Sequence, residues 1–155
     1  MTQENFYTFR DFIEKTNNYL TPSEEDYIEM IYRIYLKTNL PVRVNDLASK
    51  LNVKPPSVTK MIKKLYSKNI ISFQKYKHIY LSDKGLEIGE FLINRHNTIE
   101  NFLKILNVDV NLTYETEKIE HTLDDKIVSK INFLVKFFER DEVLLKKFHE
   151  FSRNY

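Results

Sequence analysis

The sequence predicts a mainly α-helical protein, and three observations lead to this fold class. Only two of the 155 residues are glycine, whereas lysine, glutamate, isoleucine and leucine are abundant. Along most of the chain the apolar residues recur every three or four positions, which is the period of an amphipathic helix. They amount to 42% of the chain, which is enough to build the core of one domain or of two small ones.

Several classes of protein are excluded by the composition. The chain has no cysteine, so it can form neither disulfides nor thiolate metal sites, and a reducing compartment is expected. No apolar run approaches the roughly 18–20 residues of a membrane span, and the N-terminus lacks the layout of a secretory signal. The glycine-rich loops that bind nucleotide phosphates are missing as well. We therefore expect a cytoplasmic protein with no membrane association and no nucleotide cofactor.

Three parts are expected along the chain. Residues 1–20 are an N-terminal extension, residues 21–82 form one domain, and residues 83–155 form a second, helical domain. In the extension, apolar side chains have helical spacing over residues 4–16, so this stretch is either a short amphipathic helix or a frayed terminal arm.

The domain over residues 21–82 is predicted to begin with a capped helix. Thr21 can accept hydrogen bonds from the first amides, Pro22 suits the first helical position, and Glu24 completes a capping box. This helix extends to about Lys37. The elements expected after it are a short helix over 44–51, a turn at 52–54, a helix over 55–68, and two strands over 70–75 and 78–81 that form a hairpin.

The segment from Val42 to Leu81 is strongly basic. It contains nine lysine or arginine residues and a single acidic residue, Asp46, so its net charge is +8 in a chain whose net charge is only +2. Two helices joined by a short turn and followed by a hairpin define a winged helix-turn-helix, whose second helix enters the major groove of DNA. A face of lysines is usually just solvated, but an excess this large favours contact with DNA.

The candidate DNA contacts lie at the start of this second helix, along its basic face and in the hairpin. Serine and threonine hydroxyls can bind phosphates or base edges, lysine and arginine can reach guanine or phosphate, and proline rings can contact thymine methyl groups. The candidates are Arg43, Pro55, Pro56, Ser57, Thr59, Lys60, Lys63, Lys64, Lys75 and Lys77. Double-stranded DNA is therefore the expected partner, and the sequence leaves open which of these residues read bases.

The domain over residues 83–155 is predicted to be entirely helical. Ser82 can cap a long helix from Asp83 to about Leu106. After a break at 107–112, further helices are expected over 113–123, 124–139 and 141–152. The 124–139 helix is apolar over much of its circumference, and helices of this kind are usually buried in a core or an interface.

Hard metal ligands occur in three groups. Two carboxylates lie three residues apart on the first helix, one histidine lies midway along the long helix, and an E-x-x-E-H motif places three ligands on one helical face. The residues are Asp26, Glu29, His96, Glu117, Glu120 and His121. Any one group alone is more often solvated surface or a structural histidine. If the fold brings the groups together, they form an oxygen-rich metal site.

Such a site would contain four carboxylates, two imidazoles and no sulfur. These ligands favour Mn²⁺ or Fe²⁺ over thiophilic metals, although affinity alone would favour the later transition metals. Four carboxylates in one place repel one another, and two divalent ions would balance their charge. The sequence therefore predicts a binuclear site with two ions per subunit.

Five segments of the chain resemble the diphtheria toxin repressor family. They are LTPSEEDYIEMIY, VRVNDLASKLNVKPPSVTKMIKKL, LSDKGLEIG, RHNTIENFL and EKIEHTL, in the order that the family has them. The resemblance covers about residues 20–140 and is closest to the manganese-responsive branch, the MntR-type manganese transport regulators. It implies the same six metal ligands, since the iron-responsive branch would have methionine in place of Asp26 and cysteine in place of Glu117.

The resemblance further implies a homodimeric transcriptional repressor that binds a palindromic operator when Mn²⁺ is bound. The genes under its control would encode manganese uptake. Metal binding would fix the spacing of the two recognition helices at about one turn of DNA. The domain over residues 83–155 would then be both a metal-binding and a dimerisation domain.

Two alternatives stay open in the sequence. One is a winged-helix regulator that responds to another metal, such as Fe²⁺ or Zn²⁺, or to a small organic ligand; if the ligand is organic, the acidic residues act as surface charge. The other is an enzyme with a carboxylate-bridged pair of metal ions in a helical bundle, which would use paired E-x-x-H motifs. The chain has its E-x-x-E-H motif only once, and an enzyme would leave the basic segment unexplained, so we expect no catalytic activity.

Overall fold

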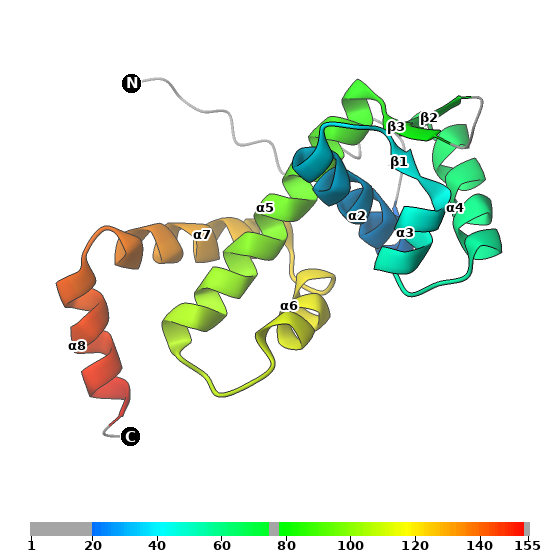
Figure 1. Cartoon of the computed structure of the whole chain (residues 1–155). Coiled ribbons are helices and arrows are strands. Elements are labelled where there is room, and N and C mark those ends of the chain that lie inside the picture. The colour runs from blue at the N-terminus through cyan, green and yellow to red at the C-terminus, as the bar shows by residue number, and fades with distance from the viewer. Residues whose placement is uncertain (1–19, 75–77, 154–155) are drawn as a thin grey trace, which may run out of the picture. The chain divides into compact units, whose positions relative to one another are not determined.

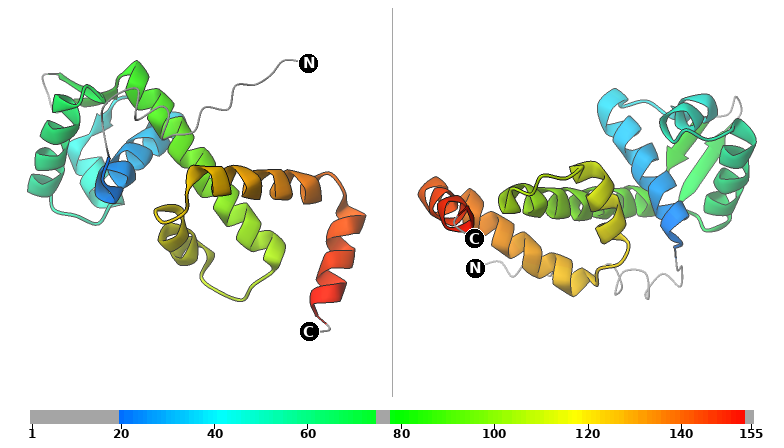
Figure 2. Two further views of the ribbon diagram at one scale, coloured as in Figure 1. Left: turned by 180° about the vertical axis from the view of Figure 1, so that it is seen from behind. Right: turned by 90° about the horizontal axis from the view of Figure 1, so that it is seen from below.

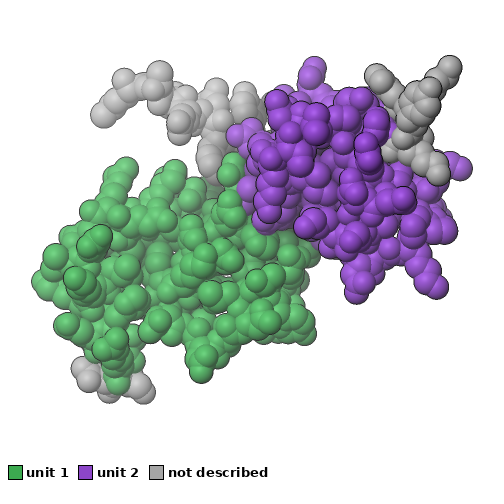
Figure 3. Space-filling model, in the orientation of Figure 1, with its two compact units in different colours: residues 1–12, 94–155 green, residues 13–93 purple. Residues whose placement is uncertain are grey.

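The computed structural model describes residues 20–74 and 78–153, and their chain forms two compact units (Figures 1 and 3). The first unit along the chain, purple and labelled unit 2 in Figure 3, ends at Ile93, and the second, green and labelled unit 1 there, begins at Asn94. The helix expected within residues 4–16 and the candidate DNA contacts Lys75 and Lys77 lie outside the described residues.

The first unit contains helices and a small antiparallel sheet. In chain order its elements are α2 (Pro22–Thr38), β1 (Val42–Arg43), α3 (Val44–Lys50), α4 (Pro55–Ser67), β2 (Ile71–Gln74), β3 (His78–Leu81) and the first part of α5 (Asp83–Leu106). The three strands lie in the order β1-β3-β2, with Val42 opposite Ile79 and Ile71 opposite Leu81. The winged helix-turn-helix prediction is confirmed, but β1 was not expected, because a strand of two residues is too short to show a repeating pattern of apolar and polar side chains.

The N-terminus of α2 has the predicted capping box. The hydroxyl of Thr21 accepts a hydrogen bond from the backbone N–H of Glu24 at 3.3 Å, and the N–H of Thr21 donates to Oε2 of Glu24 at 2.7 Å. Pro22 occupies the first turn, as expected. The box satisfies amide groups that otherwise have no partner inside the helix, which fixes where α2 begins.

One apolar face of each helix builds the core of the first unit. The side chains of Ile28 in α2, Leu47 in α3, and Val58 and Leu65 in α4 are fully buried. On α4 the buried residues recur at helical spacing, so the lysines of the opposite face remain exposed. Burial of the apolar stripe therefore decides which side of α4 is presented to a partner.

Four helices are followed by an asparagine in the left-handed conformation. Asn39, Asn52, Asn69 and Asn107, which follow α2, α3, α4 and α5, have φ between 52° and 57°. Asparagine tolerates this conformation better than other residues that carry a Cβ atom, because its short polar side chain can bond locally. These asparagines therefore end the helices in a chain whose two glycines both lie inside α5.

The start of α5 packs directly against the start of the hairpin. Ser82 caps the helix by accepting a hydrogen bond from the N–H of Gly85 at 3.1 Å, and its hydroxyl donates to the carbonyl of Ile70 at 2.9 Å. A Cβ atom on Gly85 would lie 2.1 Å from that same carbonyl oxygen. Glycine is required at this position because any side chain would meet backbone that cannot move aside alone.

We expect Gly85→Ala to destabilise the protein by about 3 kcal/mol, because the added methyl group forces α5 and the hairpin apart. Urea unfolding followed by circular dichroism measures the effect. The control is Glu87→Ala, at an exposed position two residues further along α5, which should change stability by less than about 0.5 kcal/mol. Equal midpoints for Gly85→Ala and the wild type would contradict the close packing.

The second unit contains the rest of α5 with α6 (Leu112–Glu120), α7 (Asp125–Glu139) and α8 (Glu142–Ser152), as Figure 2 shows. Its core includes Ile99 and Leu103 of α5 and Val128 of α7. The side chains of Asn111, Asp124 and Asp141 cap the three later helices, which begin within a residue of the predicted positions. The expected mainly helical fold is thus confirmed.

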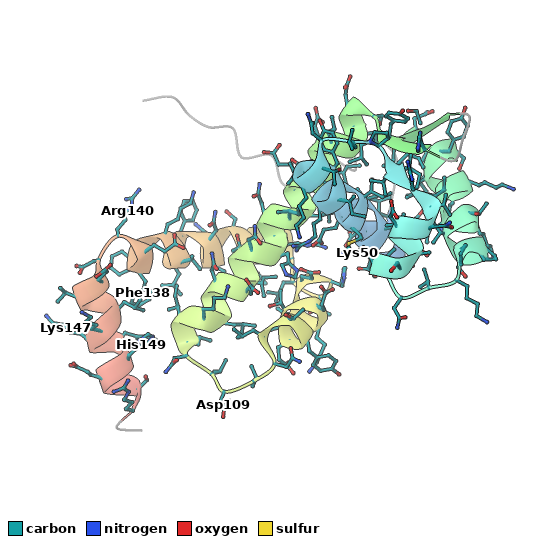
Figure 4. All side chains as sticks on the ribbon, viewed as in Figure 1. Lys50, Asp109, Phe138, Arg140, Lys147 and His149 are labelled. Carbon is teal, nitrogen blue, oxygen red and sulfur yellow. The ribbon has the colours of Figure 1, made fainter. Side chains whose placement is uncertain are left out.

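Helix α8 is attached to the end of α5 and to α7. The imidazole Nε2 of His149 lies 2.8 Å from the carbonyl oxygen of Ile105, and the ring of Phe148 lies 5.2 Å from that of Phe138. In Figure 4, Lys147 and His149 project from opposite sides of α8. None of the helices in the described ranges is long and apolar enough to cross a membrane.

Helix α7 is less buried than its composition led us to expect. Of its residues only Val128 and Val135 are buried in the chain. Phe133 and Phe137 are 60% and 57% exposed, and Ile127 and Leu134 are also exposed. Of the two predicted settings, a core and an interface, the core of a single chain therefore accounts for only one side of this helix.

Candidate metal centre and nucleic-acid interface

The second unit brings His96 and Glu120 into direct contact. His96 lies in α5, and Glu120 is the last residue of α6. The imidazole Nδ1 of His96 is 2.9 Å from Oε2 of Glu120, and the two residues are only 7% and 1% exposed. A carboxylate and an imidazole buried together are a typical pair of ligands for a divalent transition metal.

The second carboxylate oxygen of Glu120 is the strongest sign of a cation site. Oε1 of Glu120 is buried and has no hydrogen-bond partner among the described residues. Nε2 of His121 is 3.6 Å from this oxygen, which is beyond hydrogen-bond distance. Leaving a buried carboxylate oxygen unsatisfied costs about 1–3 kcal/mol or more. A metal ion bound to this oxygen would remove that cost, so the donor set fits a divalent cation.

Two more predicted ligands join this pair from α6. Oε1 of Glu117 is 3.8 Å from Nδ1 of His96, and the side chains of Glu117 and His121 each offer a ligand atom within 4.8 Å of the other. Glu117 is exposed, and His121 is half-buried at the C-cap of α6, where its Nδ1 lies 3.5 Å from the guanidinium of Arg95. Because the E-x-x-E-H motif ends α6 beside α5, four of the six predicted ligands gather in the second unit.

The other two predicted ligands belong to the first unit. Asp26 and Glu29 are one helical turn apart on α2, and Glu29 is buried. Oε1 of Glu29 accepts hydrogen bonds from the guanidinium of Arg33, at 2.7 Å from Nε and 2.6 Å from the terminal nitrogen. The pairing fixes the orientation of the Glu29 carboxylate on α2.

The exposed face of α4 carries the candidate DNA contacts. Pro55, Pro56, Ser57, Thr59, Lys60, Lys63 and Lys64 are all exposed, as is Arg43 in β1. The hydroxyl of Thr59 donates to the carbonyl oxygen of Pro55 at 3.1 Å, so it can still accept a hydrogen bond from a partner. The face combines positive charge with hydroxyl groups at the N-terminal end of a helix, where phosphate also interacts favourably with the helix dipole.

One buried ion pair in the first unit was missed at the sequence level. Oε1 of Glu24 lies 2.7 Å from Nζ of Lys68 and 3.4 Å from Nζ of Lys64. Burial alone would raise the pKa of Glu24, but the hydrogen bond from Lys68, the bonds from Thr21 and the charge of Lys68 lower that pKa below its usual value. No local pattern in the sequence could reveal this contact, because the capping box already accounts for Glu24 and its partners lie on another helix.

The comparisons with known proteins identify the class. Residues 19–79 match the family model described as the N-terminal DNA-binding domain of iron-dependent repressors, and residues 82–147 match the metal-binding and dimerisation domain of the same family. The chain belongs to the iron-dependent repressor family, also named after the diphtheria toxin repressor. The predicted family is confirmed, whereas the manganese-responsive branch stays a prediction. Since the family consists of DNA-binding repressors, the dimetal enzyme gains no support.

Solved structures agree with this assignment. The chain is similar to the metal-dependent transcriptional regulator MtsR, with 33% identity and a TM-score of 0.66 over 76% of this chain and 55% of that one. It is similar to the manganese regulator SloR, with 29% identity and a TM-score of 0.65 over 76% and 55%. It is also similar to ScaR with bound Zn²⁺, with 29% identity and a TM-score of 0.62 over 74% of this chain and 54% of that one. The chain thus spans a little over half the length of each.

Proposed function

We propose that the protein is a manganese-responsive transcriptional repressor of the MntR type. The observation that carries the proposal is the buried pair of His96 and Glu120, with an oxygen of Glu120 that has no hydrogen-bond partner among the described residues, in a chain of this family. The proposed ligands of two metal ions are Asp26, Glu29, His96, Glu117, Glu120 and His121. A bound divalent ion would supply positive charge to four carboxylates and hold them in one arrangement.

The preference for Mn²⁺ follows from the donor atoms. All six side chains bind through oxygen or nitrogen, and the chain has no cysteine. Such ligands suit Mn²⁺ and Fe²⁺, while Zn²⁺ binds many nitrogen and oxygen sites more tightly. Among the similar proteins, SloR is described as a manganese regulator and ScaR was solved with Zn²⁺ bound. The second candidate is therefore the same repressor responding to Fe²⁺ or Zn²⁺.

DNA binding is proposed to be coupled to the metal by linkage. If the metal binds more tightly to the arrangement that fits the operator, then DNA must in turn tighten metal binding by the same factor. The N-terminal end of α4 would enter the major groove of each half of a palindromic operator. The controlled genes would be those of manganese uptake.

The test is fluorescence anisotropy of a labelled duplex taken from the promoter of a manganese transporter. The protein is titrated at fixed salt with chelator and then with Mn²⁺, Fe²⁺ without oxygen, Zn²⁺ or Ca²⁺, because phosphate contacts depend on salt. Tight binding with Mn²⁺ but not with chelator is expected. Equal binding with chelator would refute metal control, and activation by Zn²⁺ alone would favour the second candidate.

We also propose that a second copy of the chain covers the exposed side of α7. This helix lies in the segment that matches a dimerisation domain, and it exposes Phe133 and Phe137 one turn apart. Exposed aromatic side chains of this kind are the usual anchors of protein interfaces. The two-fold symmetry of a dimer would match the palindromic operator.

Phe133→Glu is expected to weaken the dimer by about 100-fold or more, since it places a charge where an aromatic anchor would be buried. Analytical ultracentrifugation over a range of concentrations measures the dissociation constant. Lys147→Glu, at an exposed position of α8 and outside the proposed interface, changes the charge in the same direction and should leave the dimer intact. Unchanged dimerisation of Phe133→Glu would show that a different surface mediates self-association.

A further inference from the structure

A single buried carboxylate connects α2 to the C-terminal end of α4. The side chain of Glu24 is fully buried, its Oε2 is hydrogen-bonded, and its Oε1 is ion-paired. Oε2 accepts hydrogen bonds from the N–H and the hydroxyl of Thr21, at 2.7 and 3.0 Å. Oε1 lies 2.7 Å from Nζ of Lys68, the C-cap of α4, and 3.4 Å from Nζ of Lys64 in its last turn.

The capping box does not explain why this residue is charged. Glutamine at the same place would cap α2 as well, because its side-chain oxygen can accept the hydrogen bond from Thr21. Within the part of the chain that the structure describes, the negative charge pairs with two lysines at the C-terminal end of α4, Lys64 and the C-cap Lys68. A carboxylate buried with such a partner strongly favours one relative placement of the two helices, since separating the pair leaves a charge without compensation.

The relative placement of α2 and α4 matters because α4 carries candidate DNA contacts and α2 carries proposed metal ligands. The exposed N-terminal end of α4 presents Ser57 and Lys60, and its opposite end is the one that Glu24 holds. A helix of this length is about 20 Å long, so a small rotation at one end displaces the other end by several ångströms. Helix α2 in turn carries Asp26 and Glu29.

We propose that Glu24 is a positioning residue for DNA binding, whose buried carboxylate fixes α4 against the helix that bears the proposed ligands Asp26 and Glu29. The inference rests on the proposed function, since it concerns the DNA-binding helix of that repressor. It gives Lys68 a role that acts through Glu24 and not through phosphate. It also gives Lys64, a predicted DNA contact, a second partner inside the protein.

Glu24→Gln separates the two roles of the residue. The variant retains the cap and loses the ion pair. Simple electrostatics predicts tighter DNA binding after removal of a negative charge, whereas the positioning role predicts that Mn²⁺-saturated protein binds the duplex about tenfold more weakly. The two explanations thus predict opposite changes in DNA affinity. Fluorescence anisotropy well below the unfolding temperature measures this affinity, and circular dichroism verifies that the variant is folded. Affinity equal to or higher than that of the wild type would overturn the proposal.

Variants of Lys68 give a second, independent test that leaves the buried side chain of Glu24 unchanged. Lys68→Gln should weaken binding to a similar extent, Lys68→Arg should restore it, and the double variant Glu24→Gln/Lys68→Gln should be no weaker than either single variant. If Lys68 contacts phosphate instead, its loss would add to that of Glu24 and would lower the slope of log affinity against log salt by about 1. That outcome would overturn the positioning role.

The same measurements distinguish this proposal from the function on which it rests. If the wild type binds the duplex equally with Mn²⁺ and with chelator, the metal-dependent function fails, and the Glu24 and Lys68 variants are still compared with the wild type under either condition. Calorimetric titration with Mn²⁺ completes the set. Glu24→Gln should retain the metal affinity of the wild type within about twofold, because Glu24 is not a proposed ligand. A large loss of Mn²⁺ affinity would indicate a disrupted α2 and overturn the positioning role.

Discussion

Replacing Glu120 by glutamine is expected to abolish the Mn²⁺-dependent binding of operator DNA. The substitution replaces a buried, charged ligand with a neutral amide, and we expect the affinity for Mn²⁺ to fall by more than about 100-fold, since even residues behind the ligands contribute factors of 10–100. Calorimetric titration with Mn²⁺ and anisotropy with the labelled duplex measure the two effects. Operator affinity in the presence of Mn²⁺ should equal that of the wild type with chelator.

The same variant should be more stable than the wild type when no metal is present. Oε1 of Glu120 is buried without a hydrogen-bond partner among the described residues, and an amide costs less to bury at such a place than a carboxylate does. We expect a gain of about 1 kcal/mol in chelator. With Mn²⁺ at about 100 times its dissociation constant, the wild type alone should gain about 2.7 kcal/mol. Opposite changes in stability and function are the signature of a ligand rather than a structural residue.

Glu115→Gln is the matched control for this experiment. Glu115 lies on the same helix, and its carboxylate pairs with Lys118 at 2.9 Å on the surface. Surface pairs of this kind contribute little to stability, so the control should bind Mn²⁺ and the operator as the wild type does. A full Mn²⁺ response in Glu120→Gln would remove Glu120 from the ligand set and with it the main support for the proposed centre.

Most of the helical framework followed from local signals in the sequence. Helix α5 has the predicted bounds of Asp83 and Leu106, because Ser82 caps its start and Asn107 adopts the left-handed conformation just after its end. Both signals act over a few residues and are independent of the rest of the fold. Strand β1 was missed for the opposite reason, since its two residues are extended only because they pair with β3.

The candidate site was predictable only where its residues share a helix. The spacing of Glu117, Glu120 and His121 placed them on one face of α6, but nothing local indicated that His96 of α5 would lie against Glu120. The pairing of Glu24 with Lys68 depends likewise on tertiary packing. The exposure of Phe133 also had no local signal, because spacing shows which residues share a face of α7 but not which face the rest of the chain covers. The order of the motifs, through the family resemblance, was the signal that grouped His96 with the ligands of α6.

Lys60→Glu is expected to weaken operator binding by about 100-fold or more, because it replaces a cation with an anion beside the phosphates. Lys60 is exposed near the N-terminal end of α4, opposite the buried stripe of Val58 and Ile62. Lys60→Ala should lower affinity by about tenfold, as expected for loss of a contact worth 1–3 kcal/mol. Anisotropy with the Mn²⁺-saturated protein measures both losses, and neither variant should change Mn²⁺ affinity.

The salt dependence decides whether Lys60 binds phosphate or a base. Loss of a phosphate contact lowers the slope of log affinity against log salt by about 1 and weakens all duplexes alike, whereas loss of a base contact preserves the slope and relaxes the sequence preference. Lys147→Ala, at an exposed position of α8, is the control for loss of one positive charge and should leave the slope unchanged. Operator affinity of Lys60→Glu within about twofold of the wild type would mean that α4 does not enter the groove by this end, because a reversed charge beside phosphate cannot be neutral.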